Sequence, residues 1–168
     1  MSLRHPMIFA ALLAAAPATA DLAVRFDEGA PKDRFSFENT GACAIEGATV
    51  TLDLGGSAAG LIFDVTSEGA GVEVFQPLEF VSGVEALMDV PEVIDGQNTV
   101  TLNVANLAPG AVLAFTIDVD DTLGGREITV ARSEIVGANV TMSAGDLNAT
   151  AAFDESASAV LTFNACAA

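Results

Sequence analysis

The segment from residue 112 to residue 120 constrains the fold of this chain more than any other. Four apolar residues in it alternate with smaller or polar ones: Leu113, Phe115, Ile117 and Val119. A period of two places the apolar side chains on one face of an extended chain, which is the pattern of a half-buried β-strand. Three aspartates and the pair Gly124-Gly125 follow, so this strand is expected to end in an acidic turn.

Similar short segments recur along the chain, separated by turn residues every 8–12 positions. This spacing predicts an all-β fold, a single antiparallel β-sandwich of about nine to eleven strands. Residues 82–96 are expected to form a loop, with one helical turn over residues 84–88. The other predicted strands cover residues 21–26, 34–38, 47–54, 61–66, 72–75, 99–104, 127–131, 138–142, 147–153 and 159–165.

The sequence Leu107-Ala108-Pro109-Gly110 precedes the long strand. Proline fixes one backbone angle and glycine permits an unusual one, so the chain can cross between two sheets here. This turn resembles the corner before a late strand of immunoglobulin-like and fibronectin-type sandwiches. The resemblance favours an immunoglobulin/fibronectin-like arrangement of the strands.

The N-terminus has the pattern of a secretory signal peptide. Arg4 precedes a short apolar run, and the run is followed by small residues that end at Ala20. We expect cleavage after Ala20, a mature domain over residues 21–168, and export to the periplasm or the extracellular medium. No segment is long and apolar enough to predict a membrane span, which needs about 20 residues.

Cys43 and Cys166 are the two cysteines. In an exported protein an even number of cysteines is typical of a disulfide. We therefore expect a Cys43–Cys166 disulfide that joins an early strand to the last one. The alternative is a pair of free thiols.

Composition excludes several classes of function. The formal net charge is −17, which argues against nucleic acid as a partner and favours cations or a basic partner. The only histidine, His5, lies in the predicted signal peptide. This excludes histidine-assisted hydrolysis and histidine-based zinc sites in the mature chain.

The acidic turn is the main candidate site. Asp118 and Asp120 are two positions apart on a strand and should share a face, while Asp121 and Glu127 flank the turn. Calcium binds six to eight oxygen ligands from carboxylates and main-chain carbonyls. These four residues are therefore candidate calcium ligands. The alternative is a set of solvated acids at a strand end, with Arg126 as an ion-pair partner.

The same acids could serve a carboxylate-dependent hydrolase. Glycosidases use two carboxyl groups about 5–9.5 Å apart, and alternate residues on a strand are about 6.6 Å apart. However, the chain has no Trp or Tyr to stack on a sugar, so no enzymatic activity and no catalytic residue are predicted. Asp27, Glu28 and Asp33 form a second, weaker acidic cluster.

Three blocks of sequence carry a resemblance to a known family: FTIDVDDTLGGREITV at 115–130, SEIVGANVT at 133–141 and GLIFDVTSEGAGVEVFQP at 60–77. Together they resemble small exported bacterial proteins labelled aggregation factor core proteins, after the core protein of the marine-sponge aggregation factor. The resemblance implies a non-enzymatic, calcium-dependent adhesion module that binds a protein or glycan at the cell surface. An alternative is a structural accessory of an envelope assembly that binds its partner by edge-strand addition.

Overall fold

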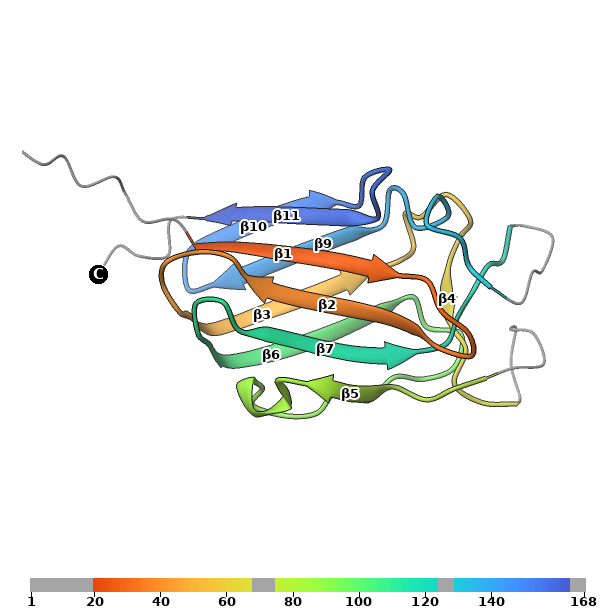
Figure 1. The fold of residues 1–168 in the computed structure, drawn as a ribbon, viewed down its shortest axis with the longest axis horizontal. Coiled ribbons are helices and arrows are strands. Elements are labelled where there is room, and N and C mark those ends of the chain that lie inside the picture. Colours follow the sequence, from red (N-terminus) through yellow and green to blue (C-terminus); the bar gives the residue numbers. More distant parts are fainter. Residues whose placement is uncertain (1–19, 68–74, 124–128, 164–168) are drawn as a thin grey trace, which may run out of the picture.

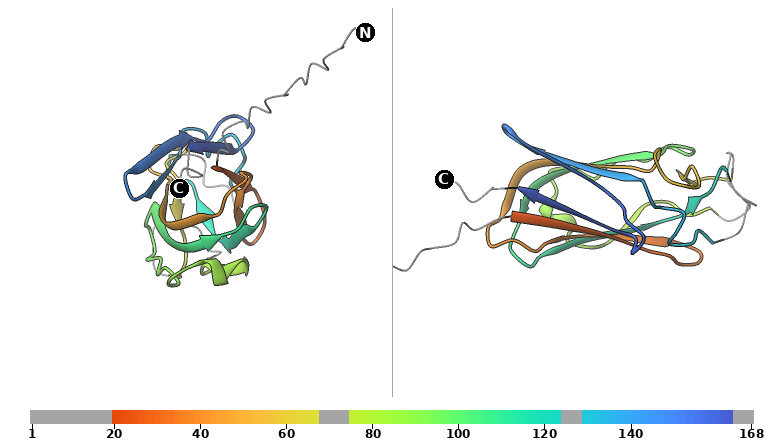
Figure 2. Two further views of the ribbon diagram at one scale, coloured as in Figure 1. Left: turned by 90° about the vertical axis from the view of Figure 1, so that its left-hand side faces the viewer. Right: turned by 90° about the horizontal axis from the view of Figure 1, so that it is seen from above.

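The computed structural model describes residues 20–67, 75–123 and 129–163. These residues form eleven strands and one short 3-10 helix. Two main antiparallel sheets pack face to face in two layers, as Figures 1 and 2 show. The all-β prediction is confirmed, whereas the order of the strands does not by itself show an immunoglobulin-like connectivity.

The five-stranded sheet has the order β11-β1-β2-β7-β5. Alternation along β2 places Phe35 and Phe37 in the core and leaves Arg34 and Glu38 exposed. This is the period of two that the sequence shows for a half-buried strand. The strands are β1 (Ala20–Asp27), β2 (Asp33–Asn39), β5 (Glu79–Ser82), β7 (Val112–Ile117) and β11 (Ser158–Phe163).

The four-stranded sheet has the order β10-β9-β3-β6. Its outward face is polar, with the hydroxyls of Thr51 and Thr101 3.3 Å apart across β3 and β6, while Val50 and Leu52 point into the core. The strands are β3 (Ile45–Asp53), β6 (Thr99–Leu107), β9 (Asn139–Ala144) and β10 (Leu147–Ala152).

Phe115 of β7 is at the centre of the core and is fully buried. Its ring lies 5.4 Å from that of Phe35, 5.9 Å from that of Phe37 and 5.8 Å from that of Phe80. Aromatic pairs at such distances add stability beyond the burial of their area. The long strand predicted from the sequence therefore organises the five-stranded sheet.

A separate two-stranded ribbon closes one end of the sandwich. It pairs β4 (Ile62–Phe63) with β8 (Val119–Asp120) in antiparallel register. The predicted strand over 112–120 is thus interrupted at Asp118, because the chain leaves β2 and β5 at Ile117 and pairs with β4 instead. The strand predicted over residues 127–131 is wrong for residues 129–131, which belong to no strand. Residues 127 and 128 lie outside the described part.

The segment after β5 covers the edge of β6. The 3-10 helix η1 (Val84–Ala86) confirms the predicted helical turn. Leu87 then forms a β-bridge with Val104, and the Met88 N–H donates to the Asn103 carbonyl at 2.7 Å. No helix in the described residues has the length and hydrophobicity to cross a membrane.

Cys43 lies in the turn between β2 and β3 and is not a free thiol. Cys166 lies outside the described residues, so the predicted pairing of the two cysteines stays a prediction. The signal peptide over residues 1–20 lies almost entirely outside them as well.

Candidate functional site

Five aspartates are buried at the end of the sandwich where β2 begins, β7 ends and the β4–β8 ribbon lies, on the right in Figure 1. We call them the aspartate cluster. Each is exposed to solvent by less than a tenth of its surface: Asp33 2%, Asp64 2%, Asp118 6%, Asp120 3% and Asp121 8%. Three of the four candidate calcium ligands predicted from the sequence, Asp118, Asp120 and Asp121, are in this cluster. They are buried, so the alternative prediction of solvated acids is wrong for these three, and their role as ligands stays a prediction.

The register of the ribbon explains why three of these aspartates face the same way. Ile62 pairs with Asp120 and Phe63 with Val119, and the Asp64 N–H donates to the Asp118 carbonyl at 3.1 Å. Asp64 is therefore the cross-strand neighbour of Asp118. Because side chains alternate along a strand, Asp64, Asp118 and Asp120 lie on one face of the ribbon.

Several oxygens in the cluster accept no hydrogen bond from any described residue. They are both carboxylate oxygens of Asp64, Oδ2 of Asp118 and Oδ1 of Asp121. Asp64 can instead donate a hydrogen bond to Asp95 when it carries a proton. Asp33 differs, because its Oδ1 accepts a hydrogen bond from the Gly29 N–H at 3.0 Å. Buried polar atoms in proteins are almost always hydrogen-bonded, so the atoms without partners require an explanation.

Burial and mutual repulsion disfavour the charged forms of these acids. Burial raises the pKa of Asp118 to about 7, and the negative charge of Asp120 adds to the increase. Burial likewise raises the pKa of Asp33 to about 7, against the stabilising hydrogen bond from Gly29. Asp64, described next, is the third aspartate with a pKa of about 7. All three values are far above the ordinary pKa of aspartate.

Asp64 is coupled to a sixth aspartate, Asp95. Burial raises the pKa of Asp64 to about 7, and a hydrogen bond to the Asp95 carboxylate adds to the increase. Burial alone would raise the pKa of Asp95, but hydrogen bonds from the Val65 and Thr66 N–H groups and from Asp64 lower it. Two ionised carboxylates cannot donate to each other, so the Asp64–Asp95 hydrogen bond exists only when Asp64 carries a proton.

No described basic residue neutralises the cluster. The ion pair between described residues joins Lys32 Nζ to Glu79 Oε2 at 2.7 Å, beside the cluster rather than in it. Arg126 and Glu127, predicted as a salt partner and a calcium ligand, lie outside the described residues. Buried acids of this kind are stabilised by protonation, by a basic partner or by a bound cation.

Asp118 and Asp120, the pair considered for carboxylate catalysis, are exposed by 6% and 3% of their surface. The absence of enzymatic activity stays a prediction. Among the described residues no three acidic, cysteine or histidine side chains are close enough together to hold a metal ion by themselves. Any cation bound here needs main-chain carbonyls or water in addition to carboxylates.

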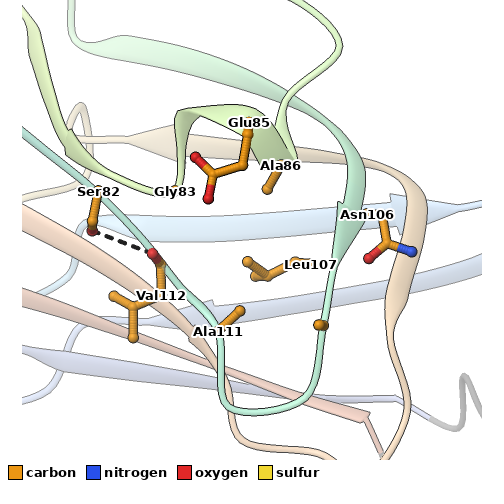
Figure 3. A pocket seen from close by; sticks show the side chains of 9 residues that line it. Ser82, Gly83, Glu85, Ala86, Asn106, Leu107, Ala111 and Val112 are labelled. Atoms are coloured by element: carbon orange, nitrogen blue, oxygen red, sulfur yellow. Dashed lines mark hydrogen bonds between the residues drawn. The ribbon is translucent and has the colours of Figure 1, made fainter.

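A second candidate surface lies along β5 and η1. A hollow of about 410 Å³ separates the end of β5 and η1 from the turn between β6 and β7, and Figure 3 shows its side chains. The Ser82 hydroxyl donates to the Val112 carbonyl at 3.2 Å across one side of it. The remaining walls are mostly small or apolar: Gly83, Glu85, Ala86, Asn106, Leu107, Ala108 and Ala111.

Comparison with known proteins identifies no relative of this chain. No protein family model matches the sequence, and no curated protein matches it. The resemblance to aggregation factor core proteins therefore stays a prediction.

Proposed function

We propose that this chain is an exported, non-enzymatic binding or adhesion module of the aggregation-factor-core type, built on an immunoglobulin/fibronectin-like sandwich. Its partner is a protein at the cell surface, bound through β5 and the segment that follows it. The observation that carries this proposal is the concentration of exposed apolar side chains on this edge. Four of the nine large apolar residues that are exposed in the described part lie on β5, on η1 or in the turn that follows, namely Val81, Val84, Met88 and Val90.

The exposed residues follow one another along β5, η1 and the next turn. Val81 is 48% exposed, Met88 62% and Val90 65%. Exposed apolar side chains that gather on one edge are typical of interaction sites in soluble proteins. The hollow beside Leu107 and Val112 offers room for one further apolar side chain of a partner.

The backbone of β5 is also available to a partner. β5 is the last strand of its sheet and pairs only with β7 among the described strands. Its outer edge can therefore accept an extended segment by β-strand addition, in which main-chain hydrogen bonds supply affinity and side-chain pockets supply specificity. The sequence suggests two functions, an adhesion module and an envelope accessory that binds by edge-strand addition. Both would use this same binding mode.

The charge of the surface indicates the chemistry of that partner. Glu85 and Asp89 lie on or next to the apolar edge, whereas Glu79 of β5 is paired with Lys32. Complementary charge favours correct partners, and juxtaposed like charges disfavour wrong ones. An extended segment with apolar and basic residues fits this edge, whereas a second copy of this acidic chain would be repelled.

The test is adhesion of the labelled, exported protein to cells of its producing strain that lack the gene. We expect saturable binding that Val84→Asp/Met88→Asp weakens by about tenfold or more, the loss expected when central apolar contacts are removed. Val160→Asp is the control, because Val160 lies on β11 and is exposed by 58% of its surface, between Val84 at 42% and Met88 at 62%. Absence of saturable binding, or equal losses in the two variants, would refute the proposal.

A further inference from the structure

We propose that Asn148 is an N-glycosylation site, to which an oligosaccharyltransferase joins a glycan from a lipid pyrophosphate donor. The site rests on the export that forms part of the proposed function, but it does not depend on the apolar edge or on its partner. The chain contains the acceptor pattern Asn-x-Thr twice, at Asn139-Val140-Thr141 and at Asn148-Ala149-Thr150. The structure distinguishes between the two.

The second sequence lies at the tip of the β9–β10 hairpin. Gly145 and Asp146 connect the two strands. Asn148 and Thr150 are both exposed, and because they are two positions apart on β10 their side chains are on the same face of the strand. The Asn148 Nδ2 donates only at 3.4 Å, to the Asp146 carbonyl. The acceptor amide and the threonine hydroxyl of the pattern are therefore accessible together.

The first sequence is held within the sheet. Asn139 belongs to β9, a central strand, and pairs with Asp53 of β3 on one side and Ala152 of β10 on the other. Its Nδ2 donates to the Gly137 carbonyl at 3.1 Å. The backbone of Gly56 is also close, since a Cβ atom there would lie 3.2 Å from this nitrogen. Asn139 is thus the less accessible acceptor, which leaves Asn148 as the site.

The backbone of the Asn148 segment is accessible as well. β10 is the outermost strand of its sheet and pairs with β9 alone among the described strands. A transferase can therefore bind its outer edge as an extended segment, or separate it from β9 without breaking any other strand pairing. Asp146, two positions before Asn148, adds a negative charge that a basic acceptor groove attracts.

The transfer is a substitution at the anomeric carbon of the donor sugar. The bond between this carbon and a pyrophosphate oxygen breaks, and the lipid pyrophosphate leaves with the electron pair. A bond forms between the same carbon and Asn148 Nδ2, and the nitrogen loses one proton to a base of the transferase. In Figure 1, β10 lies at the top of the molecule and β5 at the bottom, so the glycan leaves the apolar edge uncovered.

The test is the intact mass of the protein recovered from its producing strain. We expect the mass of residues 21–168 plus one glycan, and peptide fragmentation that places the glycan on Asn148. Asn148→Gln and Thr150→Ala should each lose the added mass completely. Thr150→Ser keeps the hydroxyl of the acceptor pattern and should retain the added mass, as should Asn139→Gln.

Two results would overturn the inference. One is a wild-type chain that lacks residues 1–20 and carries no glycan, and the other is an added mass that persists in Asn148→Gln, which would indicate linkage to a hydroxyl. A circular dichroism spectrum shows whether each variant is folded. A chain that retains residues 1–20 and carries no glycan would refute the export on which both proposals rest. Asn148→Gln should adhere to cells as the wild type does, so failure of the adhesion experiment leaves the glycosylation site intact.

Discussion

Replacing Asp64 by asparagine should stabilise the calcium-free protein at about pH 8. The substitution keeps the size of the side chain and removes a buried group that resists ionisation. Burial raises the pKa of Asp64 from 3.8 to about 7. Because the folded protein holds this proton more tightly than the unfolded chain, the free energy of unfolding falls as the pH rises from about 4 to about 7.

The size of the effect follows from the same values. At about 1.36 kcal/mol per pKa unit, ionisation of Asp64 costs the folded state up to about 4 kcal/mol above pH 7. Part of this cost is offset, because the pKa of Asp95 beside it is lowered. We therefore expect Asp64→Asn to raise the free energy of unfolding by about 2 kcal/mol at about pH 8, and by less than about 0.5 kcal/mol at about pH 4.

Urea unfolding in the presence of chelator measures both quantities. Circular dichroism is the suitable signal, since the chain has no Trp or Tyr. The slope of the free energy of unfolding against urea concentration should not change, because the variant buries the same surface as the wild type. A loss of stability at about pH 8 would refute the reasoning, since it would mean that ionised Asp64 makes a favourable native interaction.

The remaining predictions concern calcium, the core and one turn. If the acidic turn binds calcium, as the sequence predicts, millimolar calcium should stabilise the wild type more at about pH 8 than at about pH 5, because calcium and protons compete for the same carboxylates; thermal melts with equal shifts at both pH values would contradict this. Phe115→Ala should lower the free energy of unfolding by about 3–5 kcal/mol in urea titrations, since its ring contacts those of three other phenylalanines. A loss below about 1 kcal/mol would show that this core repacks around the vacancy. Asn39→Ala should cost about 1–3 kcal/mol in the same assay, because the Leu107 carbonyl loses its buried donor; a neutral result would mean that water replaces the amide.

The sequence predicts local alternation well. Leu113, Phe115 and Ile117 are buried as predicted, and the helical turn after β5 is present at Val84–Ala86. Both features depend on neighbours in the sequence. Hydrophobic periodicity reports which residues share a face, and this is the part of the fold that a single sequence specifies most directly.

The aspartate cluster could be predicted only in part. Alternation correctly places Asp118 and Asp120 on one face, but it does not reveal that another segment covers that face. Asp64 joins them through the pairing of residues 62–64 with residues 118–120. Such long-range pairing depends on the register between distant strands, which local patterns do not determine. A useful signal was present, since Asp64 interrupts an apolar run between Phe63 and Val65.

The irregularity of β5 has a consequence for the adhesion that we propose. β5 has four residues, and its register shifts between Phe80 and Ser82. Short and bulged edge strands limit open-ended pairing between chains, so a partner segment gains few main-chain hydrogen bonds here. Each contact is then weak and readily reversed. Firm attachment requires many copies presented together, so that the high effective concentration supplies avidity that one copy lacks.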